Sequence, residues 1–394
     1  MIPVAVAGTA PDAPRLAALP PLSLYVHFPW CVRKCPYCDF NSHEATGGVG
    51  GIPEEAYVAA LIDDLESALP QVWGRPVTSV FFGGGTPSLL SGAAVERLLA
   101  AFRARLPLLP DAEITLETNP GTAEAEKFAA FRAAGVNRLS LGIQSFDDAR
   151  LAALGRIHSG GEALRAVDLA LRHFPRVNLD LMYALPDQTL AQARHDLATA
   201  VACGAQHISA YHLTLEPNTA FHHAPPPLPD DDLAADMQDM VEETLAAAGY
   251  QHYETSAFAR PGQRCRHNLN YWTYGDYLGI GAGAHAKISF PERILREARR
   301  KHPAEYLHGG RIQEQREVAA CERPFEFMMN ALRLTEGFDA RLFAERTGLP
   351  LAVLHAELRS AERDGLLTVT PERIVPTPQG QRFLNRLLGM FLPP

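Results

Sequence analysis

Short apolar runs alternate with segments of helical periodicity along the first half of the chain. The first run spans residues 22–28, and later runs span residues 79–82, 113–119, 138–145, 178–185 and 207–213. Between the first two runs, Tyr57, Leu61, Leu65 and Leu69 recur at the spacing of an amphipathic helix. Alternating strands and helices indicate parallel strands joined by right-handed crossovers. The pattern therefore predicts six parallel strands that alternate with helices.

The positions of polar residues favour a barrel over an open, doubly wound sheet. Polar residues follow nearly every predicted strand at its carboxyl end, for example in Leu-Glu-Thr-Asn at residues 116–119. In α/β barrels, this end of the strands carries the chemistry. We therefore predict an α/β fold built on a partial (β/α)6 TIM-like barrel.

From residue 325 onward the pattern changes to helices followed by a short hairpin, which is similar to a winged-helix module. In the predicted helix at 350–364, the positive charge of two arginines is offset by the carboxylates of Glu357, Glu362 and Asp364. We therefore expect a lid or partner module rather than a DNA binder. The predicted units are a disordered tail (1–20), the barrel (21–292), a linker (293–324) and the C-terminal winged-helix-like domain (325–394).

Composition excludes several classes of protein. The chain is 47% apolar, but it contains no run of eighteen apolar residues, the length needed to span a bilayer. No lysine or arginine precedes Arg15, so the start of the chain does not resemble a secretory signal. A net charge of −9 argues against general nucleic-acid binding. Six cysteines without a disulfide pattern predict a reducing, cytoplasmic compartment.

Cys31, Cys35 and Cys38 follow the first predicted strand with the spacing C-x3-C-x2-C. Three thiolates can hold three irons of a 4Fe–4S cluster and leave the fourth iron open to another ligand. A structural zinc site would need His27 or His43 as a fourth ligand. A redox pair of Cys35 and Cys38 would leave Cys31 unused. The open cluster is favoured because it uses all three cysteines.

Residues 83–87, Gly-Gly-Gly-Thr-Pro, follow the second predicted strand and could bring bare backbone close to a ligand. No Gly-Lys-Ser/Thr follows, so this turn is not a P-loop. Glu117, Gln144 and Asp180 lie at the ends of successive strands, and Arg156 could join them. Each could be an ordinary polar group at a strand end. Together they suit a ligand with an ammonium group, a carboxylate and ribose hydroxyls.

These motifs resemble the radical S-adenosylmethionine (SAM) superfamily, in the branch of the oxygen-independent coproporphyrinogen III oxidases and their relatives. The resemblance covers the chain from about residue 22 and implies the radical-SAM form of the partial barrel. It implies that Cys31, Cys35 and Cys38 hold the 4Fe–4S cluster, and that SAM chelates the open iron. Reduction of the cluster would then cleave SAM to a 5′-deoxyadenosyl radical. The matching SAM-site positions are Tyr25, Tyr37, Gly84, Gly85, Thr86, Glu117, Gln144, Arg156 and Asp180.

Two features distinguish members of this branch. The oxidases carry a fourth cysteine where this chain has Phe40, whereas the heme chaperones have phenylalanine there together with a His-Asn-x-x-Tyr-Trp motif. A neutral imidazole can be an axial ligand of heme iron, although a hydrogen-bonded structural histidine is the ordinary alternative. The resemblance implies heme binding at His267, Asn268, Tyr271 and Trp272.

We therefore expect a cytoplasmic heme chaperone that carries a 4Fe–4S cluster with exchangeable SAM and passes heme to acceptor hemoproteins, such as those of the respiratory chain. The alternative is an enzyme that decarboxylates coproporphyrinogen III to protoporphyrinogen IX, an activity we do not expect. A DNA-binding regulator is a third class, disfavoured by the acidic balance. The resemblance also implies a homodimer and peripheral membrane association through the acceptors. Catalytic residues, covalent or coordinate attachment of heme and a second SAM site at residues 279–283 stay open.

Overall fold

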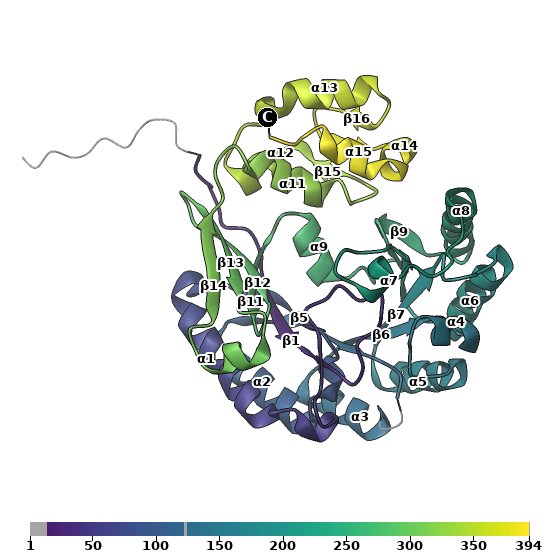
Figure 1. Cartoon of the computed structure of the whole chain (residues 1–394). Coiled ribbons are helices and arrows are strands. Elements are labelled where there is room, and N and C mark those ends of the chain that lie inside the picture. Colours follow the sequence, from purple (N-terminus) through teal and green to yellow (C-terminus); the bar gives the residue numbers. More distant parts are fainter. Residues whose placement is uncertain (1–13, 122–123, 394) are drawn as a thin grey trace, which may run out of the picture.

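A computed structural model describes residues 14–121 and 124–393 of the chain (Figure 1). Within these residues, one twelve-stranded sheet has the order β14-β13-β12-β11-β1-β4-β5-β6-β7-β8-β10-β9. Strands from β11 to β8 pair in parallel, and the strands outside them pair antiparallel. The parallel strands are β11 (Asp276–Ile280), β1 (Leu22–Phe28), β4 (Val77–Gly84), β5 (Leu108–Thr118), β6 (Arg138–Gln144), β7 (Arg176–Tyr183) and β8 (His207–His212).

Helices cover the outer face of this sheet, as Figure 1 shows. They are α1 (Glu54–Val72), α2 (Gly92–Arg105), α3 (Glu124–Ala134), α4 (Asp148–Ala153), α5 (Gly160–His173), α6 (Leu190–Cys203) and α8 (Asp231–Ala247). The predicted partial (β/α)6 barrel is confirmed. Because helices cover one face and the barrel interior covers the other, β1 is buried along nearly its whole length. None of the helices in the described part of the chain is long and apolar enough to cross a membrane.

Local sequence explains where individual helices begin. Helix α5 starts with a capping box, in which Ser159 and Glu162 each bond the other's backbone amide. Thr189 and Gln192 form the same arrangement at the start of α6. Gly204 ends α6 in the left-handed conformation, with φ of 80°.

The predicted linker is instead an edge of the sheet. Residues 293–324 contain β13 (Ile294–Arg299), α10 (Pro303–Leu307) and β14 (Ile312–Glu317), and β13 pairs with β12 (His285–Ser289). Arg299 lies within this segment, and only 1% of its surface is exposed. Its guanidinium donates to Asp64 over 2.9 Å and to Glu297 over 2.7 Å, so its charge is neutralised inside the protein.

Most of the predicted N-terminal tail, residues 1–13, lies outside the described residues. The following residues are attached to the barrel, since Leu16 is buried and its backbone N–H donates to the carbonyl of Pro291. Beyond the six predicted strands, residues 251–259 form the hairpin of β9 (Gln251–Glu254) and β10 (Ala257–Ala259).

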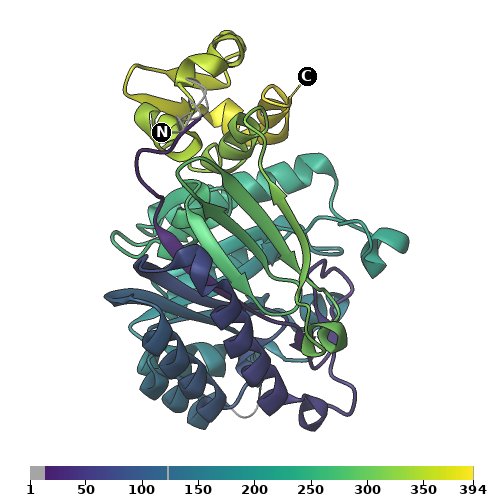
Figure 2. The same ribbon diagram turned by 90° about the vertical axis from the view of Figure 1, so that its left-hand side faces the viewer.

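The C-terminal unit has its own hydrophobic core, centred on Phe327, Phe338 and Phe343. In Figure 2 it lies above the green strands of the sheet edge. It meets the barrel where Glu326 accepts a hydrogen bond from Tyr274 over 2.7 Å. Its elements are α11 (Arg323–Ala331), β15 (Phe338–Asp339), α12 (Ala340–Thr347), α13 (His355–Arg363), β16 (Leu367–Val369), β17 (Arg373–Pro376), α14 (Pro378–Arg382) and α15 (Leu384–Gly389).

Candidate functional site

The three clustered cysteines lie on a loop that begins at the carboxyl end of β1. Two short strands, β2 (Trp30–Cys31) and β3 (His43–Glu44), pair in parallel and hold the two ends of this loop together. Inside the loop, the backbone N–H of Cys38 donates to the carbonyl of Cys35 over 3.1 Å. The cysteine loop, residues 31–43, is therefore a fixed element at the end of the barrel that carries chemistry in this architecture.

A cavity of about 330 Å³ contains all three cysteine side chains. Its walls come from the cysteine loop and from the carboxyl ends of β4, β5, β6, β7 and β8. The fold thus brings together residues that are far apart in the sequence, and Tyr25 is the predicted SAM position that does not line this cavity. Those that do line it are Tyr37, Gly84, Gly85, Thr86, Glu117, Gln144, Arg156 and Asp180.

The glycine-rich turn after β4 packs directly against the cysteine loop. The backbone N–H of Gly85 donates to the carbonyl of Phe28 over 2.7 Å. A Cβ atom on Gly85 would lie 2.5 Å from the carbonyl oxygen of Trp30, and one on Gly84 would lie 2.6 Å from the ring of His27. Gly84 also has a φ of 111°, which side-chain-bearing residues rarely adopt. These glycines are needed for close contact with residues 27–30, which lead into the cysteine loop, whatever ligand the cavity holds.

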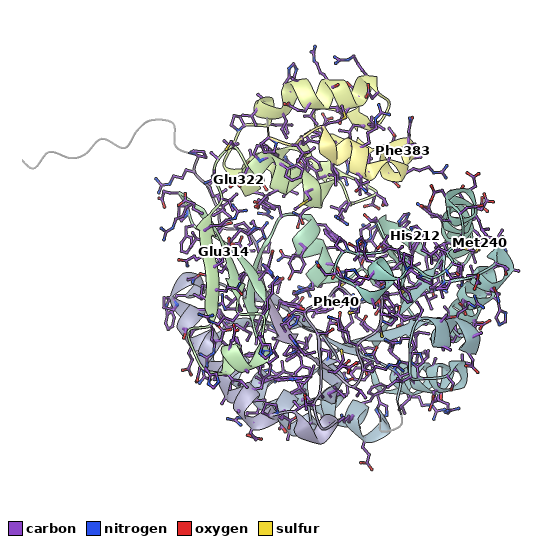
Figure 3. The ribbon with its side chains drawn as sticks, viewed as in Figure 1. Phe40, His212, Met240, Glu314, Glu322 and Phe383 are labelled. Atoms are coloured by element: carbon purple, nitrogen blue, oxygen red, sulfur yellow. The ribbon has the colours of Figure 1, made fainter. Side chains whose placement is uncertain are left out.

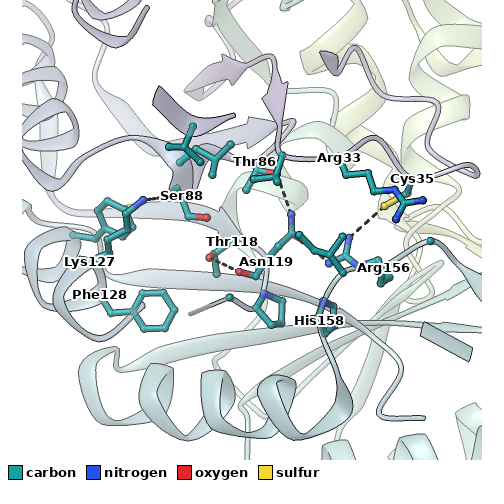
Figure 4. Close-up of a pocket in the computed structure, with 18 residues that line it drawn as sticks. Arg33, Cys35, Thr86, Ser88, Thr118, Asn119, Lys127, Phe128, Arg156 and His158 are labelled. Carbon is teal, nitrogen blue, oxygen red and sulfur yellow. Dashed lines mark hydrogen bonds between the residues drawn. The ribbon is translucent and has the colours of Figure 1, made fainter. Parts of the chain in front are cut away.

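A chain of hydrogen bonds connects two of the cysteines, and Figure 4 shows its part from Thr86 through Asn119 and Arg156 to Cys35. Thr86 Oγ1 donates to Cys31 Sγ over 3.4 Å and accepts from Asn119 Nδ2 over 3.0 Å. Asn119 Oδ1 accepts from Arg156 Nη2 over 2.7 Å, and Arg156 Nη1 lies 3.7 Å from Cys35 Sγ. Donors directed at cysteine sulfur stabilise the thiolate form, which is the form that binds iron.

Asn119 was not among the predicted site residues, although its position indicated the role. It lies two residues after Glu117, and side chains two positions apart in a strand point to the same face. Its side chain joins Thr86 to Arg156 and lines the cavity. Asn119 directly follows β5 (Leu108–Thr118), so the alternation of that strand, continued by one residue, indicates the face of Glu117.

Two carboxyl groups give the cavity its charge preference. Enclosure in the protein raises the pKa of Glu117 to about 8, and the neighbouring Asp180 carboxyl adds to this effect. Enclosure also raises the pKa of Asp180, although Ser140 and Asn178 donate hydrogen bonds to it. A cationic ligand in the cavity would favour the ionised carboxylates. The ammonium and sulfonium groups of SAM meet this requirement.

Gln144 lines the same cavity with an unusual backbone conformation. Its φ is 67°, a value that residues with a side chain seldom adopt. The strand register between β6 and β7 shifts between Gly142 and Gln144. Such strained residues gather at ligand sites, where surrounding structure holds them in place.

Tyr25 and His27 lie next to the cavity rather than in its wall. The Tyr25 hydroxyl donates to His27 Nδ1 over 3.0 Å, and His27 Nε2 donates to the carbonyl of Asn41 over 2.9 Å. Both ring nitrogens of His27 are thus used, which leaves neither for the zinc ion considered as an alternative. Across the described residues, no three His, Cys, Asp or Glu side chains surround a single ion. A cubane has no such requirement, because each thiolate binds a different iron.

His267 belongs to α9 (Arg266–Trp272), and only 2% of its surface is exposed. Its Nδ1 lies 2.9 Å from Ser79 Oγ, which donates to Ser23 Oγ, so Nδ1 carries the proton and donates. The ring stacks on Phe81, with 4.9 Å between ring centroids. Burial lowers the pKa of His267 to about 3, and Nε2 has no hydrogen-bond partner among the described residues. This neutral imidazole has a free lone pair in a cavity of about 220 Å³.

The structure divides the predicted heme motif between two places. His267 and Tyr271, one helical turn apart, have ring centroids 5.0 Å apart, and Asn268 lines the same small cavity. Trp272 follows one residue later and lies against the C-terminal unit, with the Arg333 guanidinium 5.2 Å from its ring. Neighbouring helical residues point about 100° apart, which explains the separation.

Comparisons with known proteins agree with the motifs. The sequence profile of the Radical SAM superfamily matches residues 25–200, and that of the HemN C-terminal domain matches residues 318–383. The chain is 51% identical over 382 residues to the heme chaperone HemW of Escherichia coli strain K12, covering 96% of this chain and 100% of that protein. It is 46% identical over 380 residues to HemW of Haemophilus influenzae, covering 95% and 98%.

The fold has a close counterpart among solved structures. Coproporphyrinogen III oxidase (HemN) from Escherichia coli, described as a radical SAM enzyme, matches with a TM-score of 0.80 over 95% of this chain and 90% of that chain. The two sequences are 24% identical, so this likeness establishes the shared fold alone.

Proposed function

The chain belongs to the radical SAM superfamily and, within it, to the HemW family, and from this membership we propose that it is a heme chaperone. It binds heme and transfers it to acceptor hemoproteins. The observation that carries the proposal is the 51% identity to HemW along the whole of that protein. The oxidase HemN shares the fold at less than half that identity.

We further propose that Cys31, Cys35 and Cys38 hold a 4Fe–4S cluster and that the adjoining cavity holds SAM. Proteins of this superfamily carry both groups, and the cluster supplies the electron for reductive chemistry on SAM. The shared cavity supports the assignment, because all three sulfurs and the carboxyl groups of Glu117 and Asp180 line it. The carboxyl groups attract the cationic end of SAM, while the hydrogen-bonded chain described above positions the sulfurs.

The alternative function is oxidation of coproporphyrinogen III, which we consider because the oxidase HemN has the same fold. Phe40 stands where the resemblance places the oxidases' fourth cysteine. A phenyl ring cannot ligate iron or carry a proton, so at this position the chain lacks the thiol that the resemblance gives to the oxidases. We therefore propose heme transfer rather than decarboxylation.

We also propose that the protein acts in the cytoplasm as a homodimer. Its acceptors would include hemoproteins of the respiratory chain, and contact with them would bring it to the membrane surface.

One set of anaerobic measurements tests the proposal. The cluster is reconstituted, iron and sulfide are counted, and heme binding and transfer to an apo-hemoprotein are followed by absorbance. We expect about four irons per chain and transfer of the bound heme. Cys35→Ser should lose the cluster, whereas Cys321→Ser, at an exposed cysteine outside the cysteine loop, should keep it.

A second assay supplies coproporphyrinogen III, SAM and a reductant. Formation of protoporphyrinogen IX over repeated turnovers would favour the oxidase instead. Heme that binds but never reaches an acceptor would contradict the chaperone assignment.

A further inference from the structure

The largest of the cavities near the cysteine loop has a volume of about 760 Å³ and lies beside the proposed SAM cavity. It is bounded by the cysteine loop, by Tyr271 of α9 and by Tyr277 of β11. Cys38 and Phe40 line both cavities, so the cysteine loop forms their common wall. Its volume is within the usual range for sites that enclose small organic ligands.

The chemistry of this lining is unusually mixed. Phe40, labelled in Figure 3, has 60% of its surface exposed, and Tyr271 and Tyr277 add further aromatic surface. Lys34 and Lys301 also line the cavity. Aromatic rings suit a flat apolar ligand, and lysines suit carboxylates.

Charge is separated across the cavity. Its two carboxyl groups, Asp39 and Glu117, lie in the wall shared with the SAM cavity. Lys34, Lys301 and the exposed His285 lie in the part that is not shared. An amphipathic dianion would therefore find one cation at Lys301, remote from the cysteines in the sequence, and one at Lys34 within the cysteine loop, whose ammonium donates to the carbonyl of Phe40 over 3.4 Å.

The small cavity around His267 does not fit a porphyrin in this conformation. Its volume is about 220 Å³, and Tyr25 and Tyr271 line both it and the large cavity. These two rings thus stand between His267 and the large cavity. A ligand would have to displace them before its iron could reach His267 Nε2.

We infer that heme docks in the 760 Å³ cavity, with His285 as an iron ligand and with Lys34 and Lys301 binding the two propionates. This inference rests on the proposed heme-binding function and locates its site. Other histidines are less suitable, since His27 uses both ring nitrogens and His43 Nε2 is enclosed.

The protonation state of His285 agrees with this role. Partial burial lowers its pKa, and the nearby cations Lys301 and Arg296 lower it further, while Glu314 opposes them. The imidazole is therefore neutral at pH 7 and keeps a lone pair for iron.

Ferric heme titrated into the reconstituted full-length protein tests the site, with affinity taken from the Soret band and ligation from electron paramagnetic resonance. His285→Ala should lose the imidazole ligation signal and bind heme about tenfold more weakly or worse. Lys34→Glu/Lys301→Glu should weaken heme by a similar factor but leave binding of heme dimethyl ester unchanged, because the ester has no carboxylates. His267→Ala should keep the ligation signal. His308→Ala, at an exposed histidine outside the cavity, is the matched control.

The outcomes separate this inference from the proposed function. If the unaltered protein binds no heme, the function itself fails. If it binds heme but His285→Ala keeps the ligation signal, or His267→Ala or His43→Ala removes it, the assigned ligand is wrong and the function stands. The single variant Lys301→Glu is a control for loss of the cluster caused by the change at Lys34, because Lys301 lies far from the cysteines in the sequence. If the lysine variants weaken the binding of heme and of its dimethyl ester equally, the propionate contacts are wrong.

Discussion

The hydroxyl of Thr86 donates a hydrogen bond to the sulfur of Cys31 over 3.4 Å. This contact joins the glycine-rich turn after β4 to the loop that we propose holds iron. The backbone N–H of Thr86 strengthens the junction, because it donates to the carbonyl of Trp30 over 2.8 Å. The turn therefore supports the cysteine loop as well as lining the cavity.

Replacing Thr86 with valine should lower the reduction potential of the cluster. The hydrogen bond to sulfur offsets negative charge on the reduced cluster, and its loss of about 1 kcal/mol corresponds to about 40 mV in a one-electron couple. A redox titration followed by electron paramagnetic resonance measures the shift. Thr118→Val is the control, because Thr118 lines the cavity but donates to the backbone of Asn119. Equal potentials in both variants would mean that the contact has no electrostatic role.

Gly84→Ala should cost more than about 2 kcal/mol of folding free energy and reduce SAM binding. It combines a positive φ with a Cβ atom 2.6 Å from the ring of His27. Gly74→Ala isolates the backbone effect, because Gly74 has a φ of 75° and nothing within 4 Å, so about 1 kcal/mol is expected. Gly50→Ala has neither problem and should be neutral. Urea unfolding ranks the three variants; a Gly84→Ala protein as stable as Gly50→Ala would contradict the close approach.

Glu326→Gln should loosen the junction between the barrel and the C-terminal unit. The Glu326 carboxylate is 8% exposed and accepts hydrogen bonds from Tyr274 and Arg296, each over 2.7 Å. Loss of one member of a buried ion pair costs about 3 kcal/mol. Glu336→Gln breaks the more exposed pair with Arg264 and should cost less than about 1 kcal/mol. Urea unfolding monitored by tryptophan fluorescence reports both, since Trp272 lies at this junction.

Glu254 should make stability fall as pH rises. Burial raises its pKa to about 7, against an ordinary value of 4.5, although the N–H of Ser256 and the charge of Arg333 oppose the shift. Because the pKa is higher in the folded state, the stability from the protonated carboxyl is complete below pH 4.5 and is lost as pH rises through about 7. The loss is about 3 kcal/mol.

The matched variants for this prediction are Glu254→Gln and Glu314→Gln. The free energy of unfolding is measured in urea at pH 4.5 and at pH 8. Between these two pH values it should fall more in the unaltered protein than in Glu254→Gln. Glu314 is exposed on β14, so its variant should follow the unaltered protein. Parallel pH profiles for all three proteins would show that Glu254 is solvated.

Patterns local in the sequence predicted the barrel well. The alternation of apolar runs and amphipathic segments located β1, β4, β5, β6, β7 and β8, and the motifs at their ends located the residues of the proposed SAM cavity. These features depend on periodicity within one segment and on the rule that parallel strands end at the same edge.

Features that depend on distant partners were missed. The segment containing Arg299 was predicted as a linker because Asp64, which neutralises Arg299 inside the protein, lies 235 positions away. The heme motif looked like one surface because its residues are adjacent, yet the turn of α9 sends Trp272 to Arg333. Neither neutralisation by a remote carboxylate nor the orientation of a seven-residue helix can be obtained from local pattern.

The shared wall at Phe40 has a thermodynamic consequence. Phe40 borders both cavities, so a ligand that moves this ring from one side changes the wall that a ligand on the other side meets. Linkage requires reciprocity: the factor by which the first changes the dissociation constant of the second is the factor by which the second changes that of the first. A ligand that moved Phe40 in one cavity would then change the affinity of the other cavity by the same factor in both directions, so the two sites would be read together and not one at a time.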